Sequence, residues 1–443
     1  MPNSKRLLSA VPFYACVLLL AYMPFHVFLV QWLSTFTGGL SVWKVAKDAM
    51  IALGTVFVIC LVIRQGKLNK TFEWLLGLTV LYGLLHLILW VTHPDIYRPS
   101  AILGVTYNLR VPCFALIGYG AALLRPDLFK RISLIKVTIW AGTIVAALGV
   151  IQYFLPSDFL THFGYSVARG VKPNFFIDDK PNLPRIMSTL RDPNSLGAYL
   201  IVPMTLLVAE ITQAGRMFRV RILYIAAWLT QFGALWLTFS RSALLAAALS
   251  IALFLVFQYW HQGVQIAKRF WLPLAFAVVL LTGGLFMARN SYFEKSVISH
   301  HTGAPKAQYD SNGFHWFFVQ RGIKGIVHDP LGHGPGTAGL ASIQNPKGSF
   351  LTENYYVQIG YEAGIVGLAI FIALNMFVYS KLFAKRTNDI TVALLASFWA
   401  YVLMNMLLHT WSNEAVACQW WILAGVIMAL PAAKNLKPTR SKI

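Results

Sequence analysis

Residues 133–155 read SLIKVTIWAGTIVAALGVIQYFL, and Lys136 is the only charged residue among them. A helix of about 20 predominantly apolar residues crosses the hydrocarbon core of a bilayer. The whole chain of 443 residues has the same character, with 57% hydrophobic and 12% charged residues, whereas soluble domains are about 45–50% apolar and about 25% charged. The composition excludes a soluble enzyme, a disordered protein and a disulfide scaffold. It predicts an all-α integral membrane protein.

Twelve apolar spans follow one another along the chain. They cover about 11–32, 43–63, 72–92, 101–124, 133–155, 195–213, 220–239, 241–260, 270–288, 352–380, 390–411 and 415–433. We therefore expect about twelve transmembrane helices in a single polytopic membrane domain over residues 1–443. The chain carries 37 Lys and Arg against 16 Asp and Glu, and part of this excess sets the orientation in the membrane.

The short connections that alternate with the spans predict this orientation. If Lys5 and Arg6 are cytoplasmic, every short connection on their side is basic, as 64–70 and 125–131 illustrate. Cytoplasmic loops are enriched in Lys and Arg. An even number of spans returns the C-terminus to the same side, so we expect both termini in the cytoplasm.

Two long connections, about 156–194 and about 289–350, then fall on the outer side, and the second joins spans 9 and 10. Long connections in compact structures are usually functional or disordered. The outer side retains these basic residues against the usual charge bias: Arg169, Lys172, Lys180, Arg185, Arg191, Arg241, Arg289, Lys295, Lys306, Arg321, Lys324 and Lys347. They indicate either a solvated basic surface or an extracytoplasmic site for an anionic ligand.

Arg185 and Arg191 precede a predicted helix start, because Asp192-Pro193-Asn194-Ser195 is typical of a turn followed by a helix. Helix amides beside two guanidinium groups would cradle a phosphate, with Asn194 close by. Snorkelling to lipid headgroups is the alternative. Arg241 stands between two serines in a tight turn, either as a further phosphate ligand or as a simple helix end.

Arg110 lies inside the apolar span 101–124. An intramembrane arginine is costly, and it is functional or paired by default. We expect it either to bind a substrate glycan or acceptor or to pair with a carboxylate such as Asp48 or Glu362.

Residues 314–328 predict an amphipathic helix on the membrane surface, anchored by Trp316 and Phe317. It carries His315 and Arg321, which do not share one strict helical face. Both can touch one ligand only if the helix bends.

A second polar group opens the span near residue 352. We expect Thr352 to cap this helix, with Glu353 and Asn354 projecting at the outer mouth and Gln358 one turn deeper. Asn354 and Gln358, together with Asn194, are candidates for binding the glycan or the acceptor. Nearby arginines would lower the pKa of Glu353, which suits a hydrogen bond to a sugar hydroxyl and makes a weak base. Pairing with an arginine or with the helix dipole is the alternative.

The sequence has no zinc-ligand spacing, and the glycines around Gly334 do not form a nucleotide fingerprint. We expect no metal, no cofactor and no nucleic-acid partner.

Four segments in this order resemble the bacterial O-antigen ligase and O-antigen polymerase superfamily, over about residues 105–380. They are 185–200 with Pro193-Asn194, Ser240-Arg241-Ser242, Asp329-Pro330-Leu331-Gly332, and Glu353-Asn354 through Gly364 and Gly367. The resemblance implies a large outer loop over a cavity and an inverting, metal-independent glycan transfer from a polyprenyl-diphosphate carrier to an acceptor hydroxyl.

By this resemblance, Arg185, Arg191 and Arg241 would bind the diphosphate. The histidine of the ligases would fall at or beside Glu353, and a glutamate there is similar to many polymerase-like members. In the family, an arginine often precedes the Asp-Pro-Leu-Gly turn. Here His315 stands at that position and Arg321 follows six residues later, so His315, Arg321 or both would take the place of that arginine in binding the diphosphate. His315 is the alternative base if Glu353 is not.

The resemblance thus implies a glycosyltransferase of cell-surface polysaccharide assembly in the bacterial cytoplasmic membrane. Its partners would be a polyprenyl-diphosphate-linked glycan donor, a glycan or glycolipid acceptor and the lipid bilayer. The alternative is a twelve-span transporter or flippase of lipid-linked glycan. A transporter would concentrate its charges at the bilayer midplane and show related halves.

Overall fold

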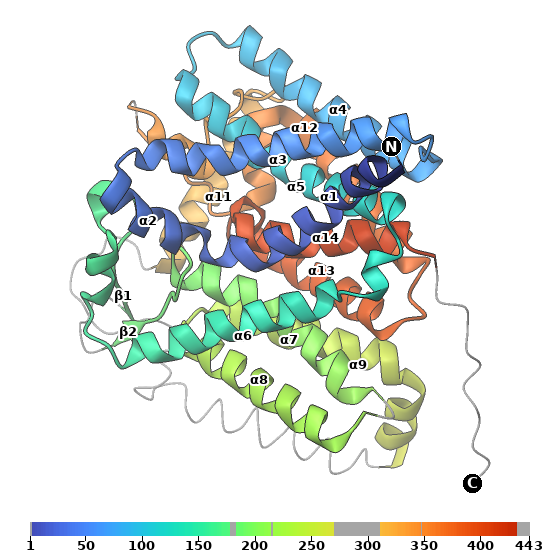
Figure 1. The fold of residues 1–443 in the computed structure, drawn as a ribbon. Coiled ribbons are helices and arrows are strands. Elements are labelled where there is room, and N and C mark those ends of the chain that lie inside the picture. The colour runs from blue at the N-terminus through green and yellow to red at the C-terminus, as the bar shows by residue number, and fades with distance from the viewer. Residues whose placement is uncertain (1, 178–182, 214–215, 270–310, 347, 432–443) are drawn as a thin grey trace.

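A computed structural model describes residues 2–177, 183–213, 216–269, 311–346 and 348–431, and its architecture is helical (Figure 1). A short antiparallel hairpin pairs β1 (Phe175–Phe176) with β2 (Pro184–Arg185). The predicted span 270–288 and the basic residues Lys180, Arg289, Lys295, Lys306 and Lys347 lie outside the described residues.

The helices follow the predicted spans closely. They are α1 (Pro2–Tyr22), α2 (His26–Thr37), α3 (Leu40–Arg64), α4 (Lys70–Thr92), α5 (Arg98–Leu124), α6 (Leu134–Tyr153), α7 (Pro193–Thr212), α8 (Phe218–Leu237), α9 (Arg241–Arg269), α11 (Ser311–His328), α12 (Tyr355–Phe383), α13 (Asp389–Leu407) and α14 (Glu414–Ala429). Ten helical segments of the described chain are long and apolar enough to cross a membrane, and α14 is a shorter apolar helix. The predicted all-helical membrane fold is confirmed, whereas the count of twelve stays a prediction.

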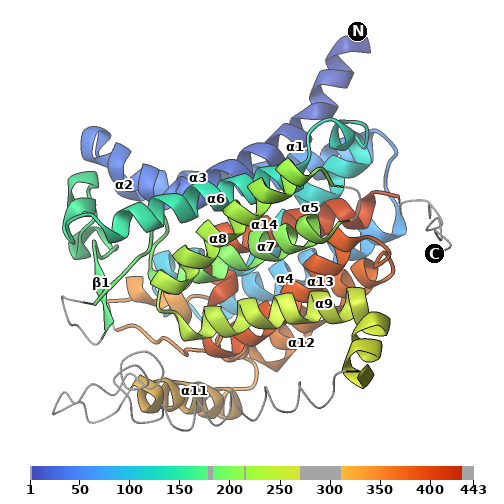
Figure 2. The ribbon, with the colours of Figure 1, turned by 90° about the horizontal axis from the view of Figure 1, so that it is seen from below.

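The start of α1 and the end of α14 lie at one end of the bundle (Figures 1 and 2). Lysines at this end cap helix C-termini. Lys67 Nζ donates to the carbonyls of Leu123 and Leu124 at 3.0 and 2.7 Å, and Lys385 Nζ donates to those of Ile427 and Met428 at 3.0 and 2.7 Å. We call this the basic end, because it carries the predicted basic connections.

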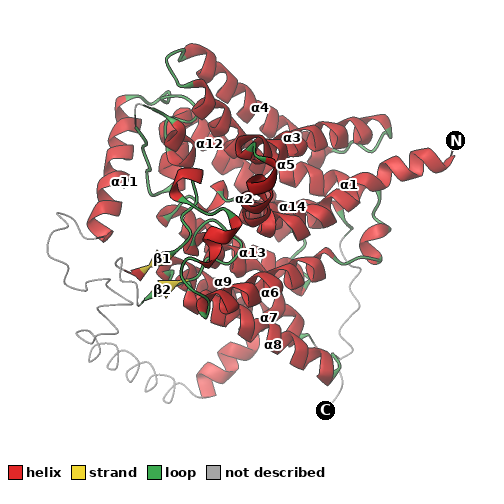
Figure 3. Ribbon diagram, turned by 60° about the vertical axis from the view of Figure 1, so that its left-hand side comes forward, coloured by secondary structure: helices red, strands yellow, loops and turns green. Residues whose placement is uncertain are grey.

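The opposite end carries the β1–β2 hairpin and α11 (Figure 3). We call it the loop end, and it is formed by the connections 154–177, 183–192, 238–240, 329–346, 348–354 and 408–413. The predicted helix over 314–328 is confirmed as α11, and Trp316 is 59% exposed on it.

The centre of the bundle is the close pair of α5 and α14. A Cβ at Gly118 of α5 would meet the Ile422 carbonyl oxygen at 2.3 Å, and one at Gly425 of α14 would meet that of Ala115 at 2.3 Å. Small residues let transmembrane backbones approach this closely. This pair is the fixed frame against which the loop end is assembled.

Candidate active site at the loop end

Arg185 is the last residue of β2 and reaches two other segments of the loop end. Its Nε donates to the Thr238 carbonyl at 2.8 Å, and its Nη2 donates to Asn194 Oδ1 at 3.0 Å. Asp192 caps α7, accepting from the Ser195 amide at 2.8 Å, so the predicted turn and helix start are confirmed. Both acceptors that the described residues offer Arg185 are neutral groups, so these hydrogen bonds orient its charge without cancelling it.

Arg241 begins α9 and lies within electrostatic range of Arg185. Burial lowers the pKa of Arg185, Asp192 partly restores it, and the charge of Arg241 lowers it again. Phe239, in the turn before Arg241, has φ 49°, and Ser188 has φ 52°. Backbone strain of this kind gathers at functional sites. The structure therefore brings two of the predicted diphosphate ligands together in a constrained turn.

Arg191 faces a different part of the loop end. It lies within electrostatic range of Lys44 on α3 and Tyr107 on α5. None of the described residues forms a hydrogen bond or an ion pair with the Arg191 guanidinium. Lys44 Nζ itself donates to the Arg169 carbonyl at 2.9 Å. A second concentration of positive charge thus lies between α3, α5 and the first long connection.

Arg110 is 2% exposed and is held by carboxylates. Its Nη2 contacts Asp48 Oδ1 at 2.7 Å, and its Nη1 contacts Glu414 Oε2 at 3.4 Å. Lys47 completes the network with distances of 3.4 Å to Asp48 and 3.8 Å to Glu414. Of the expected partners Asp48 is found, and Glu414 was not foreseen. The role of Arg110 in glycan or acceptor binding stays a prediction.

Glu362, the other expected partner of Arg110, instead anchors the glycine-rich turn. Its fully buried carboxylate accepts from the Gly336 amide at 3.1 Å and from Asn108 Nδ2 at 2.9 Å. The turn enters a break in α12 at Gly364, where φ is 68°. A Cβ at Gly336 would come within 2.0 Å of the Ser100 carbonyl oxygen. The turn is therefore a structural joint between α5 and α12.

Glu353 lies just before α12, and its Oε2 is 3.8 Å from His315 Nδ1 of α11. The two predicted catalytic residues are thus brought together. Burial raises the pKa of Glu353 and lowers that of His315. The expected lowering of the Glu353 pKa is wrong, because burial disfavours the charged carboxylate and raises the pKa.

The start of α12 also differs from the expectation. Asn354, rather than Thr352, caps the helix, with Oδ1 accepting from the Val357 amide at 3.0 Å. Glu353 has φ 53° and stands before the first turn. Gln358 is buried against Gly339, where a Cβ would lie 2.2 Å from its side chain. Asn354 and Gln358 therefore both make structural contacts, and their role toward a glycan stays a prediction.

Arg321, on α11 with His315, lies over Phe350, with 5.1 Å between Cζ and the ring centroid. Glycines fix α11 against α12, because a Cβ at Gly322 would lie 2.4 Å from the Val357 side chain. α11 thus places His315 near Glu353 and Arg321 over Phe350, two residues of the segment that precedes α12. Contact of both with one ligand stays a prediction.

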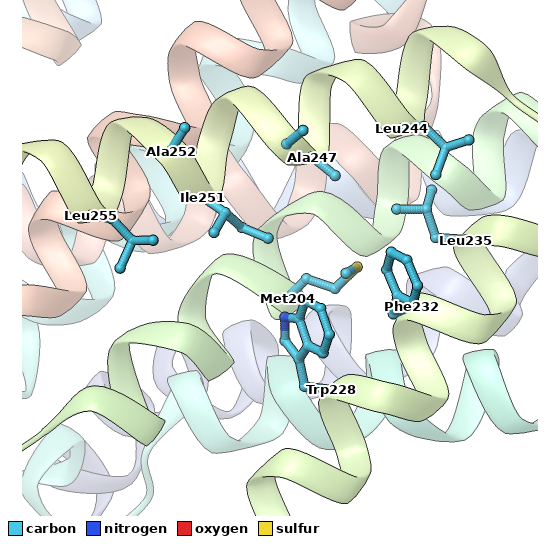
Figure 4. A pocket seen from close by; sticks show the side chains of 10 residues that line it. Met204, Trp228, Phe232, Leu235, Leu244, Ala247, Ile251, Ala252 and Leu255 are labelled. Atoms are coloured by element: carbon cyan, nitrogen blue, oxygen red, sulfur yellow. The ribbon is translucent and has the colours of Figure 1, made fainter. Parts of the chain in front are cut away.

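An apolar groove is lined by α8, α9 and Met204 of α7 (Figure 4). Its volume is about 380 Å³. It is lined by Met204, Trp228, Phe232, Leu235, Leu244, Ala247, Ala248, Ile251, Ala252 and Leu255. Phe232 and Leu255 are each 39% exposed, so the groove opens toward the surroundings of the bundle.

Sequence reasoning missed three residues around these sites. Asp48 was considered only as a partner, Glu414 was not considered, and His409 was left within a span. Asp48 and His409 lie in the predicted spans 43–63 and 390–411, so both could have been found, because ionisable residues in apolar spans are functional or paired by default. Glu414 lies between two predicted spans and carries no such signal. In the structure, Thr352 Oγ1 lies 3.1 Å from His409 Nε2.

Two comparisons bear on this arrangement. A family model described as O-Antigen ligase matches residues 225–372, which include Arg241, His315, Arg321 and Glu353. An O-antigen polymerase of Salmonella muenchen is 21% identical over 321 residues, which cover 71% of this chain and 77% of that protein. The resemblance predicted from the four segments is therefore confirmed: this chain is similar to the O-antigen ligases and O-antigen polymerases.

Proposed function

We propose that this protein is a membrane glycosyltransferase of cell-surface polysaccharide assembly. It transfers or polymerises glycan from a polyprenyl-diphosphate donor onto an acceptor sugar hydroxyl, at the extracytoplasmic face of the bacterial cytoplasmic membrane. The observation that carries the proposal is the pair Arg185 and Arg241 at the loop end, where Arg185 is held by neutral acceptors. A charge positioned in this way remains available to an anion.

In this reaction the acceptor oxygen attacks the anomeric carbon, and the bond from that carbon to the diphosphate oxygen breaks with its electron pair going to the diphosphate. Guanidinium groups that are already oriented stabilise the charge that grows on this leaving group. Arg185 is oriented by its two hydrogen bonds, so little reorganisation is needed. Attack from the face opposite the diphosphate inverts the anomeric centre.

Glu353 takes the proton of the acceptor hydroxyl. A general base works best when its pKa lies near the operating pH, and burial moves the pKa of Glu353 upward in that direction. His315 at 3.8 Å shares the proton or orients the carboxylate. Arg191 and Arg321 supply further positive charge for the diphosphate or for acidic sugars, and Asn194, Asn354 and Gln358 border the glycan path.

The apolar groove between α8 and α9 accommodates part of the polyprenyl chain. The groove is apolar and opens toward the surroundings of the bundle, so a hydrocarbon chain can pass into it from the bilayer. One end of the groove, at Leu235 and Leu244, lies close in the chain to Arg241. A carrier seated there would place its diphosphate next to the arginine pair. The donor enters sideways from the bilayer.

The test uses the purified protein in detergent with a polyprenyl-diphosphate glycan donor. We expect glycan transfer by the unchanged protein and its loss in Arg241→Ala. Arg125→Ala, which removes an arginine paired with Asp127 at the basic end, is the matched control and should retain transfer. Normal transfer by Arg241→Ala would reject the arginine assignment. A flippase would show no transfer here, because flipping requires a closed compartment.

The product in cells separates the two reactions of this superfamily. A deletion strain that accumulates single unpolymerised repeats would indicate a polymerase, and free polymer on its carrier would indicate a ligase. Glu353 at the position of the ligase histidine favours the polymerase or a divergent ligase.

A further inference from the structure

The connection 408–413 between α13 and α14 enters the loop end deeply. α14 has 16 residues, which rise about 24 Å, less than the roughly 30 Å thickness of a bilayer core. Trp411 and Ser412 in the connection are buried, and the Ser412 carbonyl accepts from Arg110 Nη1 at 3.3 Å. This short final helix brings His409 to the segment that carries Glu353.

The hydrogen bonds around Thr352 assign the tautomer of His409. Thr352 Oγ1 donates to the Asn354 carbonyl at 3.0 Å and lies 3.1 Å from His409 Nε2. A hydroxyl has one proton to donate, whereas an imidazole nitrogen can donate or accept. Both contacts are satisfied only if Nε2 carries the proton and donates to Thr352. Burial and the charge of His315 lower the pKa of His409 to about 4, so the ring is neutral.

The residue between the two anchored positions is Glu353. Thr352 on one side is bound to His409, and Asn354 on the other side donates from Nδ2 to the Met406 carbonyl at 2.9 Å. Both bonds come from one segment that is more than fifty residues further along the chain. Glu353 itself has φ 53°, a conformation that persists in a residue other than glycine only where its surroundings enforce it.

We propose that His409 is a positioning residue for the glycosyl transfer, because its Nε2–H bond to Thr352 holds Glu353 in its strained conformation opposite His315. This inference rests on the proposed function. His409 does not take the proton from the acceptor. It fixes the backbone from which the carboxylate of Glu353 is presented.

The test compares two pairs of variants in the detergent transfer assay. His409→Ala and Thr352→Val remove the bond, and each should lower kcat about tenfold to hundredfold while leaving the KM for the donor unchanged, since misplacement of a reacting group costs this much. His409→Gln places an amide N–H near the position of Nε2 and cannot titrate, and Thr352→Ser keeps the hydroxyl. Both should retain most of the activity.

Three outcomes would overturn the inference: unchanged kcat in His409→Ala, a loss in His409→Gln equal to that in His409→Ala, or a rise in the donor KM that accounts for the loss. If His409→Ala does not fold, the Thr352→Val and Thr352→Ser pair decides alone. Glu353→Gln in the same assay separates the two proposals. No transfer by the unchanged protein rejects the proposed function, and normal transfer by Glu353→Gln rejects Glu353 as the base and with it the positioning role. An inactive Glu353→Gln beside a fully active His409→Ala rejects only the positioning role.

Discussion

Arg110 in the interior and Arg185 at the loop end are both well ordered by hydrogen bonds, but they differ in what opposes their charge. Arg110 meets the carboxylates of Asp48 and Glu414 at 2.7 and 3.4 Å. Arg185 meets a backbone carbonyl and the side-chain amide of Asn194. One cation is neutralised within the protein, whereas the other is held in place with its charge still available.

This difference separates two roles that a sequence presents alike. A buried charge must be paired because an unpaired one is very costly, and the network of Arg110, Lys47, Asp48 and Glu414 meets that requirement. A partly buried charge such as that of Arg185 costs less and can await a ligand. The comparison therefore predicts that removing Arg185 impairs transfer and that removing Arg110 impairs folding.

The largest effect is expected for Arg185→Ala. Transfer should fall by about 10²–10³-fold, because one oriented donor to the charge of a transition state is worth that much. The free energy of unfolding should fall by only about 1 kcal/mol, since two hydrogen bonds to neutral groups are lost near the surface. Initial rates of glycan transfer and thermal unfolding in detergent measure both quantities. Full activity in Arg185→Ala would remove the basis of the comparison.

Arg110→Ala should show the reverse pattern in the same two measurements. It leaves Asp48 and Glu414 with Lys47 as their remaining partner, so we expect a loss of about 3 kcal/mol, the lower end for breaking a buried pair. Transfer per folded molecule should change less than in Arg185→Ala. If Arg110→Ala is as stable as the unchanged protein and does not transfer glycan, Arg110 belongs to the substrate site after all.

The sequence alone predicts much of this contrast. Apolar runs place the helices, and the positions of Arg185, Arg241 and Arg110 relative to those runs follow directly. The start of α7 is also predictable, since Asp192 caps it with a local bond to Ser195. These features depend on residues that are close together in the chain.

Features that depend on distant residues were not predictable. Asn354 replaces Thr352 as the cap of α12 because the chain at Glu353 has positive φ, a conformation tied to contacts with Met406 and His409. The sign of the Glu353 pKa shift likewise depends on burial by the assembled loop end. In both cases, contacts between residues that are distant in the chain decide the outcome: the identity of the helix cap in the first case and the direction of the pKa shift in the second.

The pH dependence of transfer identifies the base. In the described part of the loop end, His315 of α11 lies 3.8 Å from the Glu353 carboxylate. Because burial raises the pKa of Glu353 above about 4.3, kcat should fall about tenfold per pH unit once the pH drops below that raised pKa. His315→Gln should keep this acid limb. If the limb instead disappears in His315→Gln while transfer persists, His315 is the base.

The contribution of Glu353 to the free energy of unfolding should change with pH in the opposite direction to kcat. A carboxyl with a raised pKa binds more protons in the folded than in the unfolded state, so its contribution falls as the pH rises from about 4.3 to the raised pKa. Glu353→Gln should therefore flatten the unfolding temperature over that window. An unchanged pH dependence of unfolding in Glu353→Gln would show that Glu353 is not the source of the slope.

Lys385 at the basic end represents a third way to satisfy a cation, since it donates to the C-terminal carbonyls of α14. Cations stabilise helix C-termini by about 0.3–1 kcal/mol, so Lys385→Met should lower the free energy of unfolding by that amount and leave transfer per folded molecule intact. Lys130→Met is the matched control, because Lys130 is exposed at the same end and its removal changes the charge bias of the connections equally. Equal destabilisation in both variants would assign the effect of Lys385 to membrane orientation rather than to the helix cap. A larger loss of unfolding free energy in Lys385→Met alone would show that Lys385, like Arg110, stabilises the fold. Arg185 would then differ from both, because its charge serves a ligand.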